Sequence, residues 1–205
     1  MASLSAEEPV PGSTTTSAAG DAPALVLIFL DVDGVLNCRD RRKKGADLHE
    51  DLVSRFVAMV REFDARVVLS TSWRLVPHLR NRLIDRLGEA GLALERILGD
   101  TASIRTPQYK NSRGVEIEAW LRDNNPTPPP AAWIAIDDLD LVSQNPTFFP
   151  GHHVHTSMHR GFDEKCTAEA RRLLHKQGAG VSTSEGRAKG GLGSWTEEEE
   201  EGNGV

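Results

Sequence analysis

The apolar residues of the chain form short runs that are separated by stretches with helical periodicity. Three runs, at residues 24–30, 66–69 and 133–136, are largely uninterrupted, which is typical of strands buried on both faces of a sheet. Between them, apolar residues recur with the spacing of amphipathic helices, namely Leu48, Leu52, Val53, Phe56, Val57, Val60, Phe63, Leu79, Leu83 and Leu87. Strands that alternate with helices predict an α/β fold with a mainly parallel central sheet.

The C-terminal half continues the alternation. A third helix is predicted near residues 112–122, and the proline-rich stretch 126–130 cannot continue it because proline lacks the backbone N–H that a helix interior uses. A short strand at 152–155 and a last helix that includes 168–175 follow.

Composition divides the chain into a folded part and two tails. Residues 1–23 are rich in Ser, Thr, Ala and Pro and contain no aromatic residue, and residues 178–205 are rich in Gly and end in an acidic run. Both are expected to be disordered, which leaves one folded domain at 24–177. The net charge of −6 lies in the tails, because the folded part alone carries about +1.

Each of the three apolar runs ends on polar residues. Asp31 and Asp33 follow the first run, Ser70 and Thr71 the second, and Asp137 and Asp138 the third. In a parallel α/β sheet, ligands bind just beyond the carboxyl ends of the strands. These side chains are therefore expected to converge on one crevice, which predicts an active site there.

The first of these groups carries two carboxylates two positions apart. On an extended chain Asp31 and Asp33 project to the same side, so one can act as a nucleophile that forms an aspartyl-phosphate. The other can protonate the leaving oxygen and later deprotonate water. Mg²⁺ is the expected cofactor, because it accepts carboxylates, waters and phosphate oxygens in one octahedron. Gly34 permits a tight turn after the strand.

The motifs resemble those of the haloacid-dehalogenase-like (HAD) phosphohydrolase superfamily. The resemblance covers about residues 24–177 and rests on Asp-Val-Asp-Gly-Val at 31–35, Ser-Thr-Ser at 70–72 and Ile-Asp-Asp at 136–138, in the order of the superfamily. It implies a Rossmann-like three-layer α/β/α sandwich and a Mg²⁺-dependent phosphatase that acts through a phosphorylated aspartate.

The resemblance also implies roles for single residues. Ser70, with Thr71, is expected to bind the phosphoryl group, and Asp137 and Asp138 are expected to bind the metal together with Asp31 and Asp33. A cation on the helix before the third run should bind phosphate. Arg113 and Lys110 are both candidates, and Arg113 is favoured because it starts the helical pattern.

The intervals between the motifs bear on the substrate. The predicted helices occupy most of them, which leaves no room for the large cap domain that many members of the superfamily carry. An open crevice suits a phosphate on a large substrate, and the motifs look more similar to the HAD domains of nucleic-acid repair proteins than to other members. A nucleic-acid end is the first expectation, and the alternatives are a small phosphate metabolite or nucleotide, or a non-catalytic binding module.

Two groups of basic residues could contact such a substrate. Arg41, Arg42, Lys43 and Lys44 follow the first motif closely, and Arg74 follows the second. The first group is either a solvated loop or a contact for a phosphate backbone. Arg74, which follows Trp73, either lines the crevice or packs with its guanidinium in solvent.

Several other classes of function are disfavoured. An EF-hand loop would need Asp or Asn and then Gly where the chain has Val35 and Leu36. The histidines at 152–155 lack the Cys or carboxylate partners typical of zinc sites. No signal peptide, bilayer-spanning stretch or disulfide framework is evident. An intracellular protein, cytoplasmic or nuclear, without an obligate protein partner is therefore expected.

Overall fold

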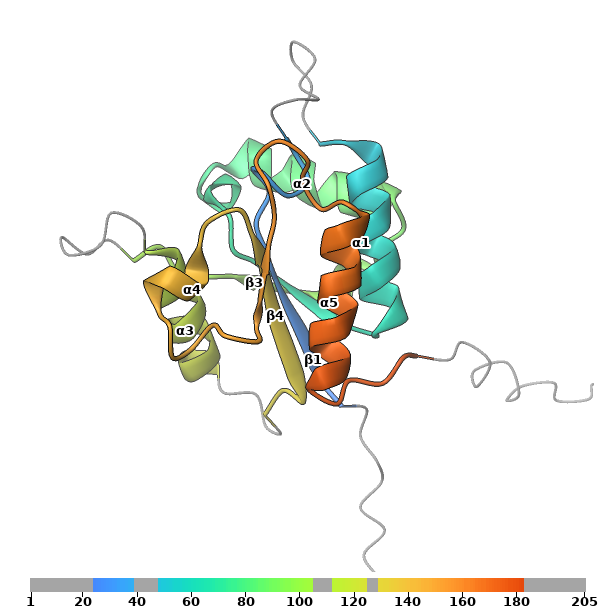
Figure 1. Ribbon diagram of the computed structural model, residues 1–205. Helices are drawn as coiled ribbons and strands as arrows, with labels where there is room; N and C mark the ends of the chain where they lie inside the picture. Colours follow the sequence, from blue (N-terminus) through green and yellow to red (C-terminus); the bar gives the residue numbers. More distant parts are fainter. Residues whose placement is uncertain (1–23, 39–47, 105–111, 125–128, 183–205) are drawn as a thin grey trace, which may run out of the picture.

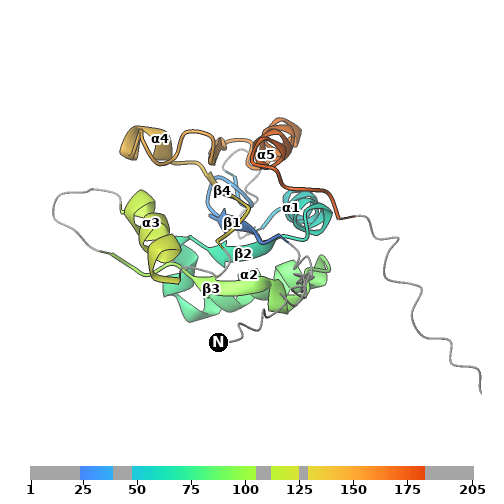
Figure 2. The same ribbon diagram turned by 90° about the horizontal axis from the view of Figure 1, so that it is seen from below.

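The computed structural model describes residues 24–38, 48–104, 112–124 and 129–182, which form a five-stranded parallel sheet with helices on both faces (Figures 1 and 2). The strand order is β3-β2-β1-β4-β5. The strands are β1 (Val26–Leu30), β2 (Arg66–Leu69), β3 (Ile97–Asp100), β4 (Ala132–Asp137) and β5 (His153–His155). This arrangement confirms the predicted Rossmann-like α/β/α sandwich.

The helices lie in two layers, as Figure 2 shows. α1 (Glu50–Glu62), α2 (Pro77–Glu89) and α5 (Glu164–Lys176) cover one face. α3 (Arg113–Asn124) and the short α4 (Leu141–Gln144) cover the other. Two 3₁₀ turns, η2 (Ser72–Leu75) and η3 (Leu94–Arg96), connect the elements around α2.

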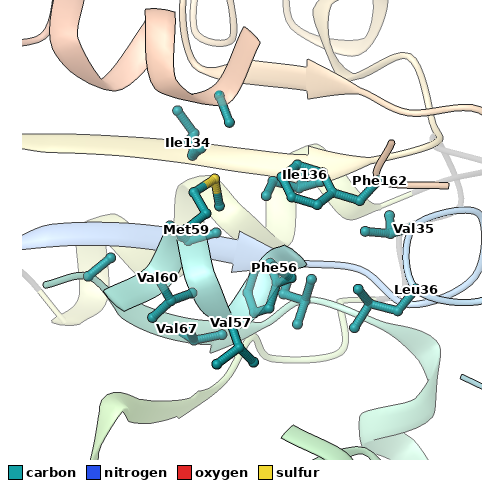
Figure 3. Close-up of a cluster of buried hydrophobic side chains, with 14 of the residues drawn as sticks. Val35, Leu36, Phe56, Val57, Met59, Val60, Val67, Ile134, Ile136 and Phe162 are labelled. Atoms are coloured by element: carbon teal, nitrogen blue, oxygen red, sulfur yellow. The ribbon is translucent and has the colours of Figure 1, made fainter. Parts of the chain in front are cut away.

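The core has two parts because successive strand residues point to opposite faces of the sheet. On the α1 side, Ile134 and Ile136 of β4 pack with Phe56 and Met59 of α1 and with Phe162 (Figure 3). On the other side, Phe29 of β1 packs with Ile117 of α3 and Phe149. Burial on both faces explains why the strands read as continuous apolar runs rather than as alternating ones.

The structure contains elements that the hydrophobic pattern did not predict. β3 is an edge strand with half-buried residues and includes Gly99, whose φ is +138°, so it lacks the apolar run that identified β1, β2 and β4. The turns η2 and η3 and the helix α4 are too short for a periodic signal. α5 begins at Glu164, one turn before the predicted stretch.

The described chain stays packed for a short distance beyond α5, and the predicted domain boundaries stay predictions. Ala179 is buried against α5 and its N–H donates to the Leu174 carbonyl, so packed chain continues past residue 177. The tails at 1–23 and 183–205 lie outside the described residues. Within the described ranges, the segments that follow β1 and β2 form elements of the sandwich itself, with no inserted cap domain. Within the described part of the chain, none of the helices has the length and apolar character that a membrane-spanning segment needs.

Candidate active site

Strand register brings the predicted site residues to one level at the carboxyl edge of the sheet. Leu30 of β1 is opposite both Leu69 of β2 and Ile136 of β4, so the residues that follow, Asp31, Ser70 and Asp137, lie side by side. The ladder continues to this edge, because Ser70 N–H donates to the Leu30 carbonyl at 2.8 Å and Asp31 N–H to the Ile136 carbonyl at 3.1 Å. The convergence expected from the sequence is therefore present.

Three carboxylates gather at this edge. One oxygen from each of Asp31, Asp137 and Asp138 lies within 4.8 Å of the others. Burial raises the pKa of the Asp137 carboxyl to about 8, and the nearby Asp31 charge adds to the shift. Burial likewise raises the pKa of Asp31 and Asp138. A bound cation would relieve this repulsion, and three carboxylate oxygens are a donor set that suits a hard cation such as Mg²⁺.

Arg113 supplies positive charge to the same cluster. It is the first residue of α3, and its Nη1 lies 2.5 Å from Asp137 Oδ2 and 3.2 Å from Asp31 Oδ1. The structure thus places Arg113 beside the acidic residues, as expected for the phosphate-binding cation on the helix before the third run. Lys110, the other candidate, lies outside the described residues.

The two residues of the second motif differ in their hydrogen bonding. Ser70 is 1% exposed, and its hydroxyl has no hydrogen-bond partner among the described residues. A buried hydroxyl without a partner is costly, so a ligand atom is expected next to it. The Thr71 hydroxyl, by contrast, donates a hydrogen bond to the Asp31 carboxylate and accepts one from the Trp73 N–H at 3.3 Å.

Asp33 lies apart from the three clustered carboxylates. Its Oδ2 accepts a hydrogen bond from Trp73 Nε1 at 3.0 Å, and its Oδ1 accepts one from Asn37 Nδ2 at 3.2 Å. Asp33 is not part of the cluster of Asp31, Asp137 and Asp138, and the role of its carboxylate in a metal site stays a prediction. Asp31 and Asp33 thus lie in different environments, which allows the two carboxylates to have different chemical roles.

Gly34 allows the first motif to pass close to Asp138. Its φ is +78°, and a Cβ at this position would lie 2.6 Å from the Cβ of Asp138. The Thr156 hydroxyl donates a hydrogen bond to the Gly34 carbonyl at 2.8 Å. The turn therefore needs glycine both for its backbone conformation and for space.

The structure corrects the expectation for Arg74, which is buried and does not line the crevice. Its Nε donates to the Thr101 carbonyl at 2.8 Å, and its Nη2 donates to Glu116 Oε2 at 2.8 Å and to the Ala102 carbonyl at 3.1 Å. Its Nη1 donates to the Thr71 carbonyl at 2.5 Å. Because these donors are occupied, Arg74 links the chain after β2 to the chain after β3 and does not act as a substrate contact.

Glu116 is a buried residue of the site that the sequence did not single out. Besides Arg74, it accepts hydrogen bonds from Ser112 Oγ at 2.9 Å and from the Ile104 N–H at 3.1 Å. Because Glu116 lies one turn after Arg113 on α3, the Arg74–Glu116 ion pair fixes the start of α3, where Arg113 begins. Glu at this helical spacing has no sequence signal that separates it from a solvated residue.

Two histidines of β5 contact the backbone of the acidic pair Asp137 and Asp138. His153 Nε2 lies 3.3 Å from the Asp137 carbonyl oxygen, and His155 Nε2 lies 3.0 Å from that of Asp138. Burial lowers the pKa of His153 to about 4, so this ring is neutral at pH 7. The histidines thus support the backbone that carries Asp137 and Asp138. The remaining predicted contacts, Arg41, Arg42, Lys43 and Lys44, lie outside the described residues.

A parallel sandwich that presents an Asp-x-Asp-Gly turn, a serine, an arginine and an acidic pair at one edge defines the class of HAD-like domains. A family model confirms this class: residues 27–167 match the model described as the HAD domain in Swiss Army Knife RNA repair proteins, and the chain belongs to this family. No curated protein and no solved structure matches the chain. Membership of the family indicates a phosphohydrolase-type function.

The buried Arg74–Glu116 pair generates a prediction about stability. Arg74→Met should lower the free energy of unfolding by about 3–5 kcal/mol, because it leaves the buried Glu116 carboxylate without its closest cation. Arg172→Met provides the matched control, since Arg172 is 58% exposed and pairs with Glu169 on the surface; it should cost about 1 kcal/mol or less. Urea unfolding measures both, and equal losses would contradict the bracing role of Arg74.

Proposed function

We propose that the protein is a Mg²⁺-dependent phosphohydrolase that forms a phosphoenzyme at Asp31. The observation that carries the proposal is the environment of the Asp31 carboxylate. This group is buried, lies 3.2 Å from Arg113 Nη1 and shares the strand edge with the Ser70 hydroxyl, which has no hydrogen-bond partner among the residues that the structure describes. A carboxylate placed between a cation and an unsatisfied donor suits attack on an anionic phosphoryl group.

The residues divide the reaction into two steps. In the first, an oxygen of Asp31 attacks phosphorus, the bond to the leaving oxygen breaks, and Asp33 gives that oxygen its proton. In the second, Asp33 takes a proton from water, the resulting hydroxide attacks phosphorus, and Asp31 departs as a free carboxylate. Asp33 thus ends protonated, as it began, and phosphate is released.

Two other groups bind the phosphoryl oxygens in this scheme. The Ser70 hydroxyl donates one hydrogen bond, which satisfies a buried group that has no partner within the described part of the chain. Arg113 donates from its guanidinium, whose planar set of N–H groups matches phosphate oxygens as well as carboxylates. Both donors are fixed before substrate binds, Ser70 by the strand ladder and Arg113 by its ion pairs.

The carboxylate cluster fits Mg²⁺ in this proposal. Asp31, Asp137 and Asp138 would hold the ion, whose charge would offset that of the carboxylates and of the phosphoryl group. Burial is the largest cause of the raised pKa values of all three groups, and the charge of Asp31 raises those of Asp137 and Asp138 further. A cation bound to the cluster would favour the charged forms.

The substrate that we propose is a phosphate at the end of an RNA strand. Support comes from the description of the family, which places its HAD domain in RNA repair proteins. Further support comes from the absence of an inserted cap among the described elements, because an open edge admits a large substrate. The basic residues at 41–44 would contact the strand away from the reacting phosphate.

The covalent step generates the first functional prediction. Asp31→Asn should abolish Mg²⁺-dependent phosphatase activity and leave the fold intact, because the amide keeps the shape but cannot act as the anionic nucleophile. Removing one charge from a crowded cluster should leave the melting temperature in Mg²⁺-free buffer at or above that of the wild type. Asp123→Asn, at an exposed position on α3, should leave activity unchanged. Near-normal turnover by a folded Asp31→Asn protein would exclude the covalent mechanism.

The metal site generates the second functional prediction. Asp138→Asn should weaken Mg²⁺ binding by about ten-fold or more, because affinity for a hard cation depends on the number of charged ligands. Isothermal calorimetry with Mg²⁺ and no substrate measures this directly, and the Mg²⁺ concentration for half-maximal activity should rise in parallel. Asp140→Asn, which changes a carboxylate at the start of α4, serves as the control. Unchanged Mg²⁺ affinity in Asp138→Asn would remove this residue from the metal site.

The substrate class is tested by a comparison of 5′- and 3′-phosphorylated oligoribonucleotides with mononucleotides, sugar phosphates and phosphopeptides. Replacing Arg41, Arg42, Lys43 and Lys44 with Ser should lower kcat/KM for the oligonucleotide and flatten its salt dependence, by about 0.7 in logarithmic slope for each strand phosphate that these residues neutralise in the wild type. Activity on 4-nitrophenyl phosphate should stay unchanged. An oligonucleotide rate that is insensitive to these substitutions, or that falls below the small-molecule rates, would contradict the RNA assignment while leaving the phosphatase reaction in place.

A further inference from the structure

The indole of Trp73 joins the hydrophobic core to the proposed proton donor. Trp73 lies in η2, directly after the second motif, and is only 7% exposed, packed within the core on the α1 side of the sheet. Its ring nitrogen, which can only donate a hydrogen bond, lies 3.0 Å from Asp33 Oδ2. The rest of the ring is apolar, so core packing fixes the direction of this N–H.

Asp33 accepts a second hydrogen bond from a residue of the turn that follows it. Asn37 Nδ2 donates to Asp33 Oδ1 at 3.2 Å. Asn37 is fixed in turn, because its backbone N–H donates to the Val32 carbonyl at 3.1 Å and its carbonyl accepts from Gly34 N–H at 2.7 Å. One donor on each oxygen defines the plane of the carboxyl group, whereas an unconstrained Asp side chain samples several rotamers.

The two carboxylates of the first motif have different hydrogen-bond partners. Arg113 is paired with Asp31, whereas N–H groups of Trp73 and Asn37 donate to Asp33. These two donors approach different oxygens of Asp33, so they constrain the orientation of its carboxyl group.

We propose that Trp73 is a positioning residue that orients the Asp33 carboxyl group for proton transfer to the leaving oxygen, with Asn37 as the second donor. The inference rests on the proposed function, since it assigns Trp73 to the first step of that reaction. Proton transfer depends on a donor within hydrogen-bond reach and correctly aimed, so loss of the indole N–H should affect only substrates that need the proton.

The test uses three phosphate esters of similar size. Their leaving groups are nitrophenolate, phenolate and benzyl alkoxide, which need protonation to an increasing degree. The quantity compared is kcat/KM, because it reports steps up to the departure of the leaving group and not the later attack of water. Trp73→Phe removes the N–H and keeps an aromatic ring in the core.

For Trp73→Phe, kcat/KM for benzyl phosphate should fall by about ten-fold, the effect of losing one hydrogen bond to an ionisable group. For 4-nitrophenyl phosphate it should change by less than about two-fold, since that leaving group departs without help. The ratio of the two values on one preparation is independent of the fraction of folded enzyme, so a loss of stability cannot imitate the result. Equal slowing with all three esters would overturn the proposal.

Three further variants complete the test. Trp133→Phe makes the same substitution near the start of β4, at the end of the strand away from Asp137. The Trp133 ring stacks on His152 with 4.1 Å between ring centroids, and its replacement should leave the ratio of the two kcat/KM values unchanged. Asn37→Ala, which spares the indole, should shift the ratio in the same direction as Trp73→Phe. In an Asp33→Ala background, Trp73→Phe should have no further effect on the ratio, and an added effect there would contradict the proposal. A wild-type protein without phosphatase activity would instead refute the proposed function.

Discussion

The site depends on one buried interaction, the placement of the Arg113 guanidinium between Asp31 and Asp137. These two carboxylates end adjacent strands and are almost fully buried, so the sheet forces like charges together in a medium that solvates them poorly. Arg113 offsets part of that cost from the first turn of α3, and the Arg74–Glu116 pair fixes that turn from behind. A buried charge network of this kind is a weak source of stability, and its arrangement fits the proposed role in binding a metal ion and a phosphoryl group.

The parallel sheet supplies the precision that this network requires. Leu30 is in register with Leu69 and Ile136. The residues that follow them therefore lie side by side at the ends of three strands, and no long loop is needed to bring them together. Apolar residues on both faces of these strands pack against α1 and α3, so the positions of Asp31, Ser70 and Asp137 are set by the core. Sites carried on rigid elements in this way hold their geometry better than sites on loops.

The sequence identified those parts of the molecule whose signal is local. Strands β1, β2 and β4 were recognised from continuous apolar runs, and Asp31, Ser70 and Asp137 from their place at the ends of those runs. Arg113 was favoured over Lys110 because it begins a helical pattern, and the structure places it in the site. The acid–base and metal roles of these residues stay predictions, as does the substrate.

The parts that were missed depend on contacts between residues far apart in the chain. Arg74 reads as a solvated arginine until Glu116, 42 positions later, is seen beside it. Trp73 likewise meets Asp33 across 40 positions, and no periodicity marks such a pair. β3 was missed for a different reason, since an edge strand that is half-exposed and contains Gly99 has no apolar run to reveal it.

Chemical trapping of the phosphoenzyme tests whether Asp31 is the nucleophile. The protein is mixed with Mg²⁺ and a phosphorylated substrate, quenched with borohydride during turnover, and digested for mass spectrometry. An acyl phosphate is reduced to an alcohol by this reagent, whereas a free carboxylate is not, so homoserine is expected in place of aspartate at position 31 and at no other position. Turnover without reduction at Asp31, or reduction at Asp33, Asp137 or Asp138 instead, would show that Asp31 is not the nucleophile.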